Sequence, residues 1–141
     1  MHPSYGGIEY YKFNITRSEL LSEIEKFKEL HPELNPPIDM PIFGNSEFDT
    51  NSYMAPMFFY YRNKQRVLYT VVVKTPKINQ SALGFYKILD PKDRSTKNDE
   101  EINISLGLFE NIKQKKLFEE KIVNPLRIQI RKKYKHYIRK N

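Results

Sequence analysis

The N-terminal part of the chain alternates between apolar and polar positions and then changes to a helical period. Residues 8–15 have apolar side chains spaced two apart, as in a β-strand. The next four residues, from Thr16 to Glu19, match a capping box, in which the threonine and glutamate side chains each accept a backbone N–H. We therefore predict a strand over 8–15 and a helix after Thr16 that ends before Pro32, because proline disfavours the α region at the preceding residue. The predicted buried stripe of this helix contains Leu20, Leu21, Ile24, Phe27 and Leu30.

The centre of the chain contains three runs that are rich in aromatic and β-branched residues, a composition typical of strands. The first two runs, residues 57–62 and 66–75, are joined by three polar residues and predict a β-hairpin. Pro76 ends the second run, and a third candidate strand covers residues 82–89. Residues 90–101 are charged without an apolar period, and this pattern predicts a loop.

Helical periods return near the C-terminus, after an ambiguous stretch. Residues 102–108 alternate strictly, which predicts a strand, although a helix that begins near Ser105 would bury other apolar positions. We favour a short strand that turns into a helix over 109–123. Asn124 and Pro125 then suit the cap and the first position of a new helix over 125–140. The apolar arc of this last helix comprises Leu126, Ile130, Tyr134, Tyr137 and Ile138.

A proline-rich segment, residues 32–56, separates the first helix from the hairpin. Its prolines prevent long regular structure, yet it is too apolar for a free linker. Exposed together, its apolar side chains would form a larger patch than monomers usually tolerate. We expect the segment to pack either on its own domain or on a protein partner. The candidate partner-binding residues are Ile42, Phe43, Phe48 and Tyr53.

These elements predict a single α+β domain over residues 1–141. A mostly antiparallel sheet of three to five strands would be covered by the N-terminal helix and two C-terminal helices. A chain of 141 residues is long enough for one packed core and too short for two. Its apolar runs are too short for a membrane-spanning helix or a secretion signal. We therefore expect a cytoplasmic protein without membrane contact.

Charge divides the chain into an acidic and a basic part. Residues 1–61 carry four basic and nine acidic side chains, whereas residues 62–141 carry twenty basic and eight acidic ones. Residues 125–141 include seven cations and no acidic residue, which is unusual for a face that is only solvated. We interpret this stretch as a surface for nucleic acid or an acidic protein. The candidate nucleic-acid-binding residues are Arg127, Arg131, Lys132, Lys133, Lys135, Arg139 and Lys140.

Aromatic residues in the predicted strands have two interpretations. Rings on an open sheet face stack nucleic-acid bases, and rings inside the domain form its core. Burial is the commoner fate, so we predict core positions for most of them. The residues concerned are Phe58, Phe59, Tyr60, Tyr61, Tyr69, Phe85 and Tyr86.

Candidate catalytic and metal-binding groups are sparse. The chain has no cysteine, which excludes disulfides, thiolate metal sites and a cysteine nucleophile. Its three histidines lack metal-ligand spacing, and the acidic residues of 90–101 alternate with lysine and arginine, as in a solvated loop. We predict no cofactor, no metal and no enzymatic activity.

Two function classes follow from these observations. The first is a non-enzymatic module that binds nucleic acid through its basic C-terminal half. The alternative is a structural or adaptor subunit of a larger assembly, such as a viral particle or a ribonucleoprotein complex. A composition rich in Lys, Ile, Asn, Tyr and Phe and poor in Ala is typical of AT-rich genomes, including those of many viruses.

Overall fold

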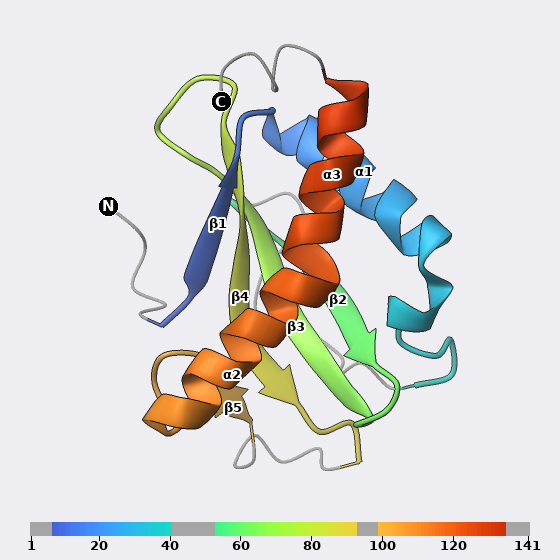
Figure 1. Ribbon diagram of the computed structural model, residues 1–141, viewed down its shortest axis with the longest axis vertical. Helices are drawn as coiled ribbons and strands as arrows, with labels where there is room; N and C mark the ends of the chain where they lie inside the picture. The colour runs from blue at the N-terminus through green and yellow to red at the C-terminus, as the bar shows by residue number, and fades with distance from the viewer. Residues whose placement is uncertain (1–6, 41–52, 93–98, 135–141) are drawn as a thin grey trace.

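The computed structural model describes residues 7–40, 53–92 and 99–134. It contains a five-stranded antiparallel sheet with the long helices on one face (Figure 1). The predicted α+β fold with an antiparallel sheet and a C-terminal helix is therefore confirmed. In the described part of the chain, no helix combines the length and apolar character that crossing a membrane requires.

Three strands form a meander, and the N-terminal strand joins it at one edge. The meander consists of β2 (Met54–Tyr61), β3 (Arg66–Lys74) and β4 (Ser81–Leu89), as the hairpin and third-strand predictions required. The first strand, β1 (Glu9–Phe13), pairs with β4, so the strand order is β1-β4-β3-β2. The short strand β5 (Glu100–Glu101) continues the β1 edge by pairing with β4.

The proline-rich segment 32–56 is regular at both of its described ends. A 3₁₀ turn, η1 (Pro32–Leu34), buries Leu34 in the core beneath the helices. The prediction of irregular structure up to Pro56 is wrong, because β2 begins at Met54 and Pro56 pairs with Val71. An edge strand tolerates a residue without an N–H, since one of its sides makes no ladder bonds.

The helix α1 (Arg17–Leu30) begins at the predicted capping box. The Thr16 hydroxyl accepts the N–H of Glu19 at 3.1 Å, and the Glu19 carboxylate accepts the N–H of Thr16 at 2.8 Å. Leu20, Ile24 and Phe27 are fully buried. The predicted burial of Leu30 is wrong, because this last helical residue is exposed and Leu34 of η1 covers the core next to β2.

Residues 102–107 form a turn that leads into a helix at Leu108, and not the strand predicted over 102–108. The strand ends at Glu101, and Asn103 adopts a left-handed conformation with φ 65°. The helix α2 (Leu108–Phe118) then begins after Gly107. Ile102 is fully buried, whereas Ile104 is exposed. The alternation misled the prediction because a chain reversal breaks the correspondence between alternate residues and two sheet faces.

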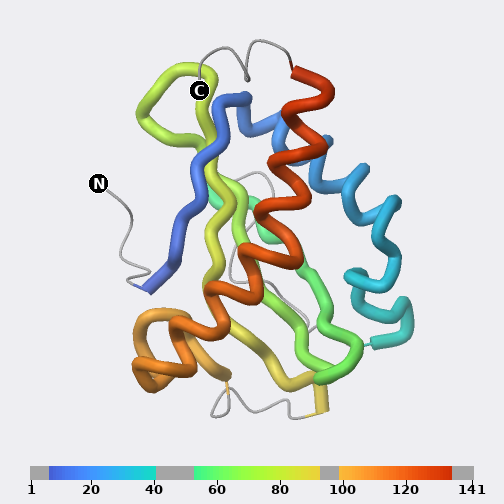
Figure 2. The backbone as a smooth tube through the Cα atoms, viewed as in Figure 1, coloured from blue at the N-terminus to red at the C-terminus, as the bar shows by residue number. Residues whose placement is uncertain are grey.

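The two predicted C-terminal helices are one continuous helical segment (Figure 2). A π-helical turn, η3 (Glu119–Val123), joins α2 to α3 (Asn124–Lys133). The N–H of Asn124 bonds to the carbonyl of Glu119, five residues back. Pro125 has no N–H for the carbonyl four residues before it, and the wider π turn accommodates the proline without ending the helix. The prediction that Asn124 caps a separate helix is therefore wrong, because Asn124 is itself helical and the segment continues from α2 through η3 into α3.

The end of α3 also differs from the predicted helix over 125–140. The helix ends at Lys133, and Tyr134 is extended, with φ −109° and ψ 93°. Leu126 and Ile130 are buried as predicted. Tyr137 and Ile138 lie outside the described residues.

Buried residues form two clusters, one on each face of the sheet. The cluster beneath the helices includes Phe59 and Phe85, which pack around Phe118 of α2. The other cluster includes Tyr69 and Tyr86, whose ring centroids are 5.4 Å apart. Both tyrosines are buried, so the face opposite the helices is not an open platform for bases, and the prediction that most of these aromatic residues are core is confirmed.

Candidate functional site

Arg127, one of the predicted nucleic-acid-binding residues, is half-buried and contacts other residues of the domain. Its guanidinium donates a hydrogen bond to the backbone carbonyl of Lys12 at 2.8 Å. It also lies 4.5 Å from the centroid of the Phe13 ring, within the range of a cation–π contact. Both contacts attach α3 to β1, so Arg127 holds the fold together and is not a free cation.

Lys133 is paired with a buried carboxylate. Its ammonium donates to Glu23 Oε2 at 2.9 Å, and the Gln129 amide donates to Glu23 Oε1 at 2.8 Å. Burial of Glu23, which is 1% exposed, acts to raise its pKa, but the bonds from Gln129 and Lys133 outweigh burial and lower that pKa. The same hydrogen bond raises the pKa of Lys133. The pair connects α1 to α3.

The other predicted cations divide into an exposed pair and residues that the structure does not describe. Arg131 and Lys132 are exposed and form no ion pair with any residue in the described ranges. Lys135, Arg139 and Lys140 lie outside the described residues, as do Ile42, Phe43 and Phe48 of the predicted partner-binding segment. Tyr53, the remaining member of that set, is exposed just before β2.

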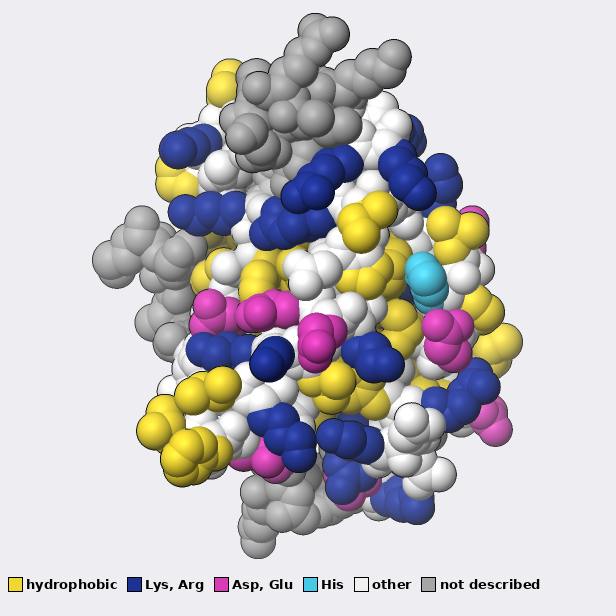
Figure 3. Space-filling model, viewed as in Figure 1, with side chains coloured by type: hydrophobic (Ala, Val, Ile, Leu, Met, Phe, Trp, Pro, Cys, Tyr) yellow, Lys and Arg dark blue, Asp and Glu magenta, His cyan; other side chains and the backbone are white. Residues whose placement is uncertain are grey.

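A second group of cations surrounds a cleft beside α2. The cleft has a volume of about 810 Å³ and lies between the end of α1, η1, the β2–β3 turn and the α2–η3 segment. Dark blue side chains occupy the lower part of the face in Figure 3, and a band of magenta acidic groups separates them from those above. The cations that line the cleft, here called the cleft cations, are Arg62, Lys64, Lys113, Lys116 and Lys121.

The cleft cations are not neutralised by their neighbours. Among the described residues, none of them forms an ion pair or a side-chain hydrogen bond. Two carboxylates, Glu33 and Glu120, also line the cleft. The Oε2 atom of Glu33 lies 3.7 Å from Nδ1 of His31. Cations therefore outnumber carboxylates by five to two, and a concave protein wall concentrates their field.

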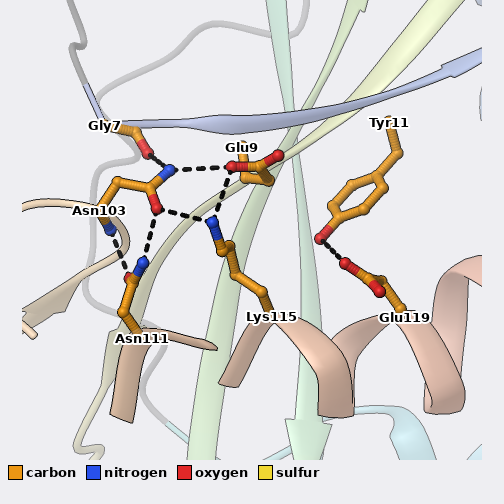
Figure 4. Close-up of polar contacts among 7 residues, drawn as sticks. All are labelled: Gly7, Glu9, Tyr11, Asn103, Asn111, Lys115 and Glu119. Atoms are coloured by element: carbon orange, nitrogen blue, oxygen red, sulfur yellow. Dashed lines mark hydrogen bonds and ion pairs between the residues drawn. The ribbon is translucent and has the colours of Figure 1, made fainter. Parts of the chain in front are cut away.

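Tyr61 lines the cleft at the end of β2. Its hydroxyl is buried and finds no hydrogen-bond partner within the described part of the chain, and burial raises its pKa. An unpartnered buried hydroxyl is unusual in a folded protein and costs stability. Tyr11 differs, because its hydroxyl donates to Glu119 Oε2 at 3.0 Å (Figure 4).

A hydrogen-bonded network holds α2 in place on its other side. The Asn103 amide donates to the carbonyl of Gly7 at 2.8 Å and to Glu9 Oε1 at 3.0 Å (Figure 4). Lys115 donates to Glu9 Oε1 at 3.3 Å and to Asn103 Oδ1 at 3.0 Å. Asn111 and Asn103 exchange two hydrogen bonds, each of 2.7 Å. All of these side chains have partners, so the network is structural and fixes the rotation of α2.

The π-helical turn lets one helical segment serve two purposes. Before the turn, α2 presents Lys113 and Lys116 to the cleft. After it, α3 buries Leu126 and Ile130 in the core. Lys121, within the turn, also lines the cleft. Such turns occur frequently at functional sites.

Charge density along the sequence did not reveal the cleft. The cleft cations come from two segments that are far apart in sequence, the hairpin turn and the α2–η3 segment, and in the second of these segments glutamates lie between the lysines. One local signal was present, because Lys113 and Lys116 are three residues apart and share a helix face. Their meeting with Arg62 and Lys64 required the tertiary fold.

The described residues contain no group of three or more His, Cys, Asp or Glu side chains arranged to hold a metal ion. No protein-family model, curated protein or solved structure matches this chain.

Proposed function

We propose that this protein is a non-enzymatic module that binds nucleic acid, with the phosphate backbone in the cleft. The observation that supports the proposal is that the five cleft cations lack partners among the described residues. Such cations contact phosphates and release the counterions condensed on the nucleic acid, which drives binding. This role suits the cytoplasmic location expected from the sequence.

An extended polyanion suits the site better than a small anion. The cleft cations come from both the hairpin turn and the α2–η3 segment, so they are distributed over two walls of a cleft of about 810 Å³. A chain of phosphates contacts several such cations at once, each adding to the affinity.

The test compares two variants with the same change in net charge. Arg62→Gln/Lys113→Gln/Lys116→Gln removes three cleft cations, and Lys12→Gln/Lys26→Gln/Lys74→Gln removes three exposed cations elsewhere. Fluorescence anisotropy with a labelled oligonucleotide, repeated over a range of salt concentrations, gives the affinity and its salt dependence. We expect the cleft variant to bind more weakly with a flatter salt slope and the control variant to change little. Equal losses in both variants, or no binding by the wild type, would contradict the proposal.

A second candidate function is the adaptor role, which one observation favours. Four large apolar side chains around the start of α2 are more than half exposed, and yellow groups gather there in Figure 3. Patches of this kind often bind other proteins. They are Ile104, Leu108, Phe109 and Ile112.

The adaptor role is tested in the native cell. Tagged wild type and a Leu108→Ser/Ile112→Ser variant would be recovered after nuclease treatment, and the co-purifying proteins identified. The adaptor role requires a protein that the wild type retains and the variant loses. Identical recovery by both proteins would exclude this patch as the docking surface.

A further inference from the structure

Phe109 lies on the same helix face as two of the cleft cations. The positions of Phe109, Lys113 and Lys116 are four and three residues apart, the spacing that places side chains on one stripe of an α-helix. Lys113 and Lys116 line the cleft, as does Glu120 further along the segment. The helix stripe that contributes Lys113 and Lys116 to the cleft therefore also contains Phe109, which lies beyond the cleft lining and is about 10 Å from Lys116 along the helix axis at 1.5 Å per residue.

The Phe109 ring is 85% exposed, and this sets it apart from the other described phenylalanines. Those at 13, 27, 59, 85 and 118 are fully buried, and Phe58 is partly buried. Leu108 and Ile112, which neighbour Phe109 on α2, are exposed as well, so the side chains next to the Phe109 ring are apolar. No described element covers this end of α2, while its other side is fixed by the Asn103 and Lys115 contacts (Figure 4).

We infer that the partner is single-stranded nucleic acid, with a base stacked on Phe109 and the adjoining phosphates on the cleft cations. The inference rests on the proposed function and specifies its ligand. An aromatic platform at the end of a cationic groove is the usual arrangement for binding single strands, because every base has a π face. Paired bases inside a duplex hide their faces from such a ring. Duplex nucleic acid therefore gains only the phosphate contacts.

Tryptophan fluorescence tests the stacking directly, because the chain has no tryptophan of its own. Phe109→Trp places a single reporter on the helix stripe of Lys113 and Lys116, and Leu108→Trp places the control roughly 100° around the helix. The probes are a 15-residue oligothymidylate, an abasic strand of the same length and a duplex. We expect the oligothymidylate to quench the indole of the Phe109→Trp variant strongly and that of the Leu108→Trp variant weakly. The abasic strand should quench neither.

Affinity measurements complete the test. Phe109→Ala is expected to weaken oligothymidylate binding about 5- to 100-fold and to leave duplex and abasic binding unchanged. Salt-dependent binding that is unaffected by Phe109→Ala, or equal affinity for single strand and duplex, would overturn the inference and leave the proposed function standing. Failure of the wild type to bind any oligonucleotide would overturn both. Loss of a protein partner in Phe109→Ala, with oligothymidylate affinity unchanged, would overturn the inference in favour of protein docking.

Discussion

The two ends of the C-terminal helical segment both carry cations, but those cations contact different groups. On α3, Arg127 is held by the carbonyl of Lys12 and the ring of Phe13, and Lys133 by the buried carboxylate of Glu23. Beside α2, the five cleft cations have no ion-pair partner in the described ranges. The α3 end had the higher charge density in the sequence, yet among the described residues only Arg131 and Lys132 of α3 lack a side-chain partner, against five cations around the cleft.

The difference matters because a phosphate must compete with any partner that a cation already has. Removing Lys133 from Glu23 would leave a buried carboxylate without its counter-charge, which is unfavourable. In the proposed function, a cleft cation would exchange only water for a phosphate oxygen and would gain the full effect of counterion release. We therefore expect the binding surface where cations lack partners, and not simply where basic residues are most numerous.

The largest expected difference between the two ends concerns packing. Ile130→Ala on α3 should destabilise the protein by about 2–4 kcal/mol, because it removes most of a fully buried side chain and leaves a cavity in its place. Ile112→Ala on α2 should change stability by less than about 0.5 kcal/mol, because its side chain is mostly exposed. Urea unfolding of both variants gives these values. A loss at Ile112 comparable with that at Ile130 would mean that the α2 patch is covered by the protein itself.

The next prediction separates free from partnered cations. Replacing Arg62, Lys64, Lys113 and Lys116 together by Gln should weaken single-strand binding on the order of 100-fold at 0.1 M salt and reduce the salt slope by roughly 3. Melting temperature should stay the same.

A variant that removes the two partnered α3 cations should behave in the opposite way. Arg127→Gln/Lys133→Gln should leave the salt slope unchanged and lower the melting temperature, because both side chains hold α3 to other elements. Anisotropy titrations and thermal melts on the same samples measure both properties. The comparison fails if the α3 variant loses as much affinity as the cleft variant.

A smaller effect on stability is expected when Glu23 is protonated at acidic pH. The pKa of Glu23 in the folded protein lies below its ordinary value of 4.5, so the unfolded chain takes up this proton first as pH falls. The stability that Glu23 contributes is complete above about pH 4.5 and is lost as pH falls through the lower folded-state pKa. The wild type should therefore have a higher melting temperature than the Glu23→Gln variant at pH 7, and the difference between the two melting temperatures should shrink towards pH 3. A difference in melting temperature that stays constant from pH 7 to pH 3 would show that the partners of Glu23 do not stabilise its charged form.

The smallest predicted effect concerns the two tyrosines beneath the helical segment. Tyr61→Phe should be neutral or stabilising by up to about 1 kcal/mol, because it removes a buried hydroxyl without a described partner. Tyr11→Phe should destabilise by about 0.5–1.5 kcal/mol, because it removes the bond to Glu119. Chemical denaturation of both variants distinguishes them. Destabilisation by Tyr61→Phe would reveal a partner for that hydroxyl.

Elements whose signals are local were predictable from the sequence. The capping box at Thr16 and Glu19 forms as expected because both hydrogen bonds join residues three apart. The hairpin and the third strand follow from runs of aromatic and β-branched residues and from a polar turn. The turn at 102–107 and the π turn before Pro125 were missed because alternation and a proline each have more than one structural solution.

The sequence by itself determined where the cations are, where the first helix begins and which central segments form the hairpin and the third strand. Only the tertiary structure decided which cations are free. Lys133 and Glu23 are 110 residues apart, and Arg127 and Lys12 are 115 apart. Such partners meet only when α3 packs on α1 and β1. The cleft likewise forms only when the hairpin turn and α2 come together, because the hydrophobic packing that places them is long-range in the chain.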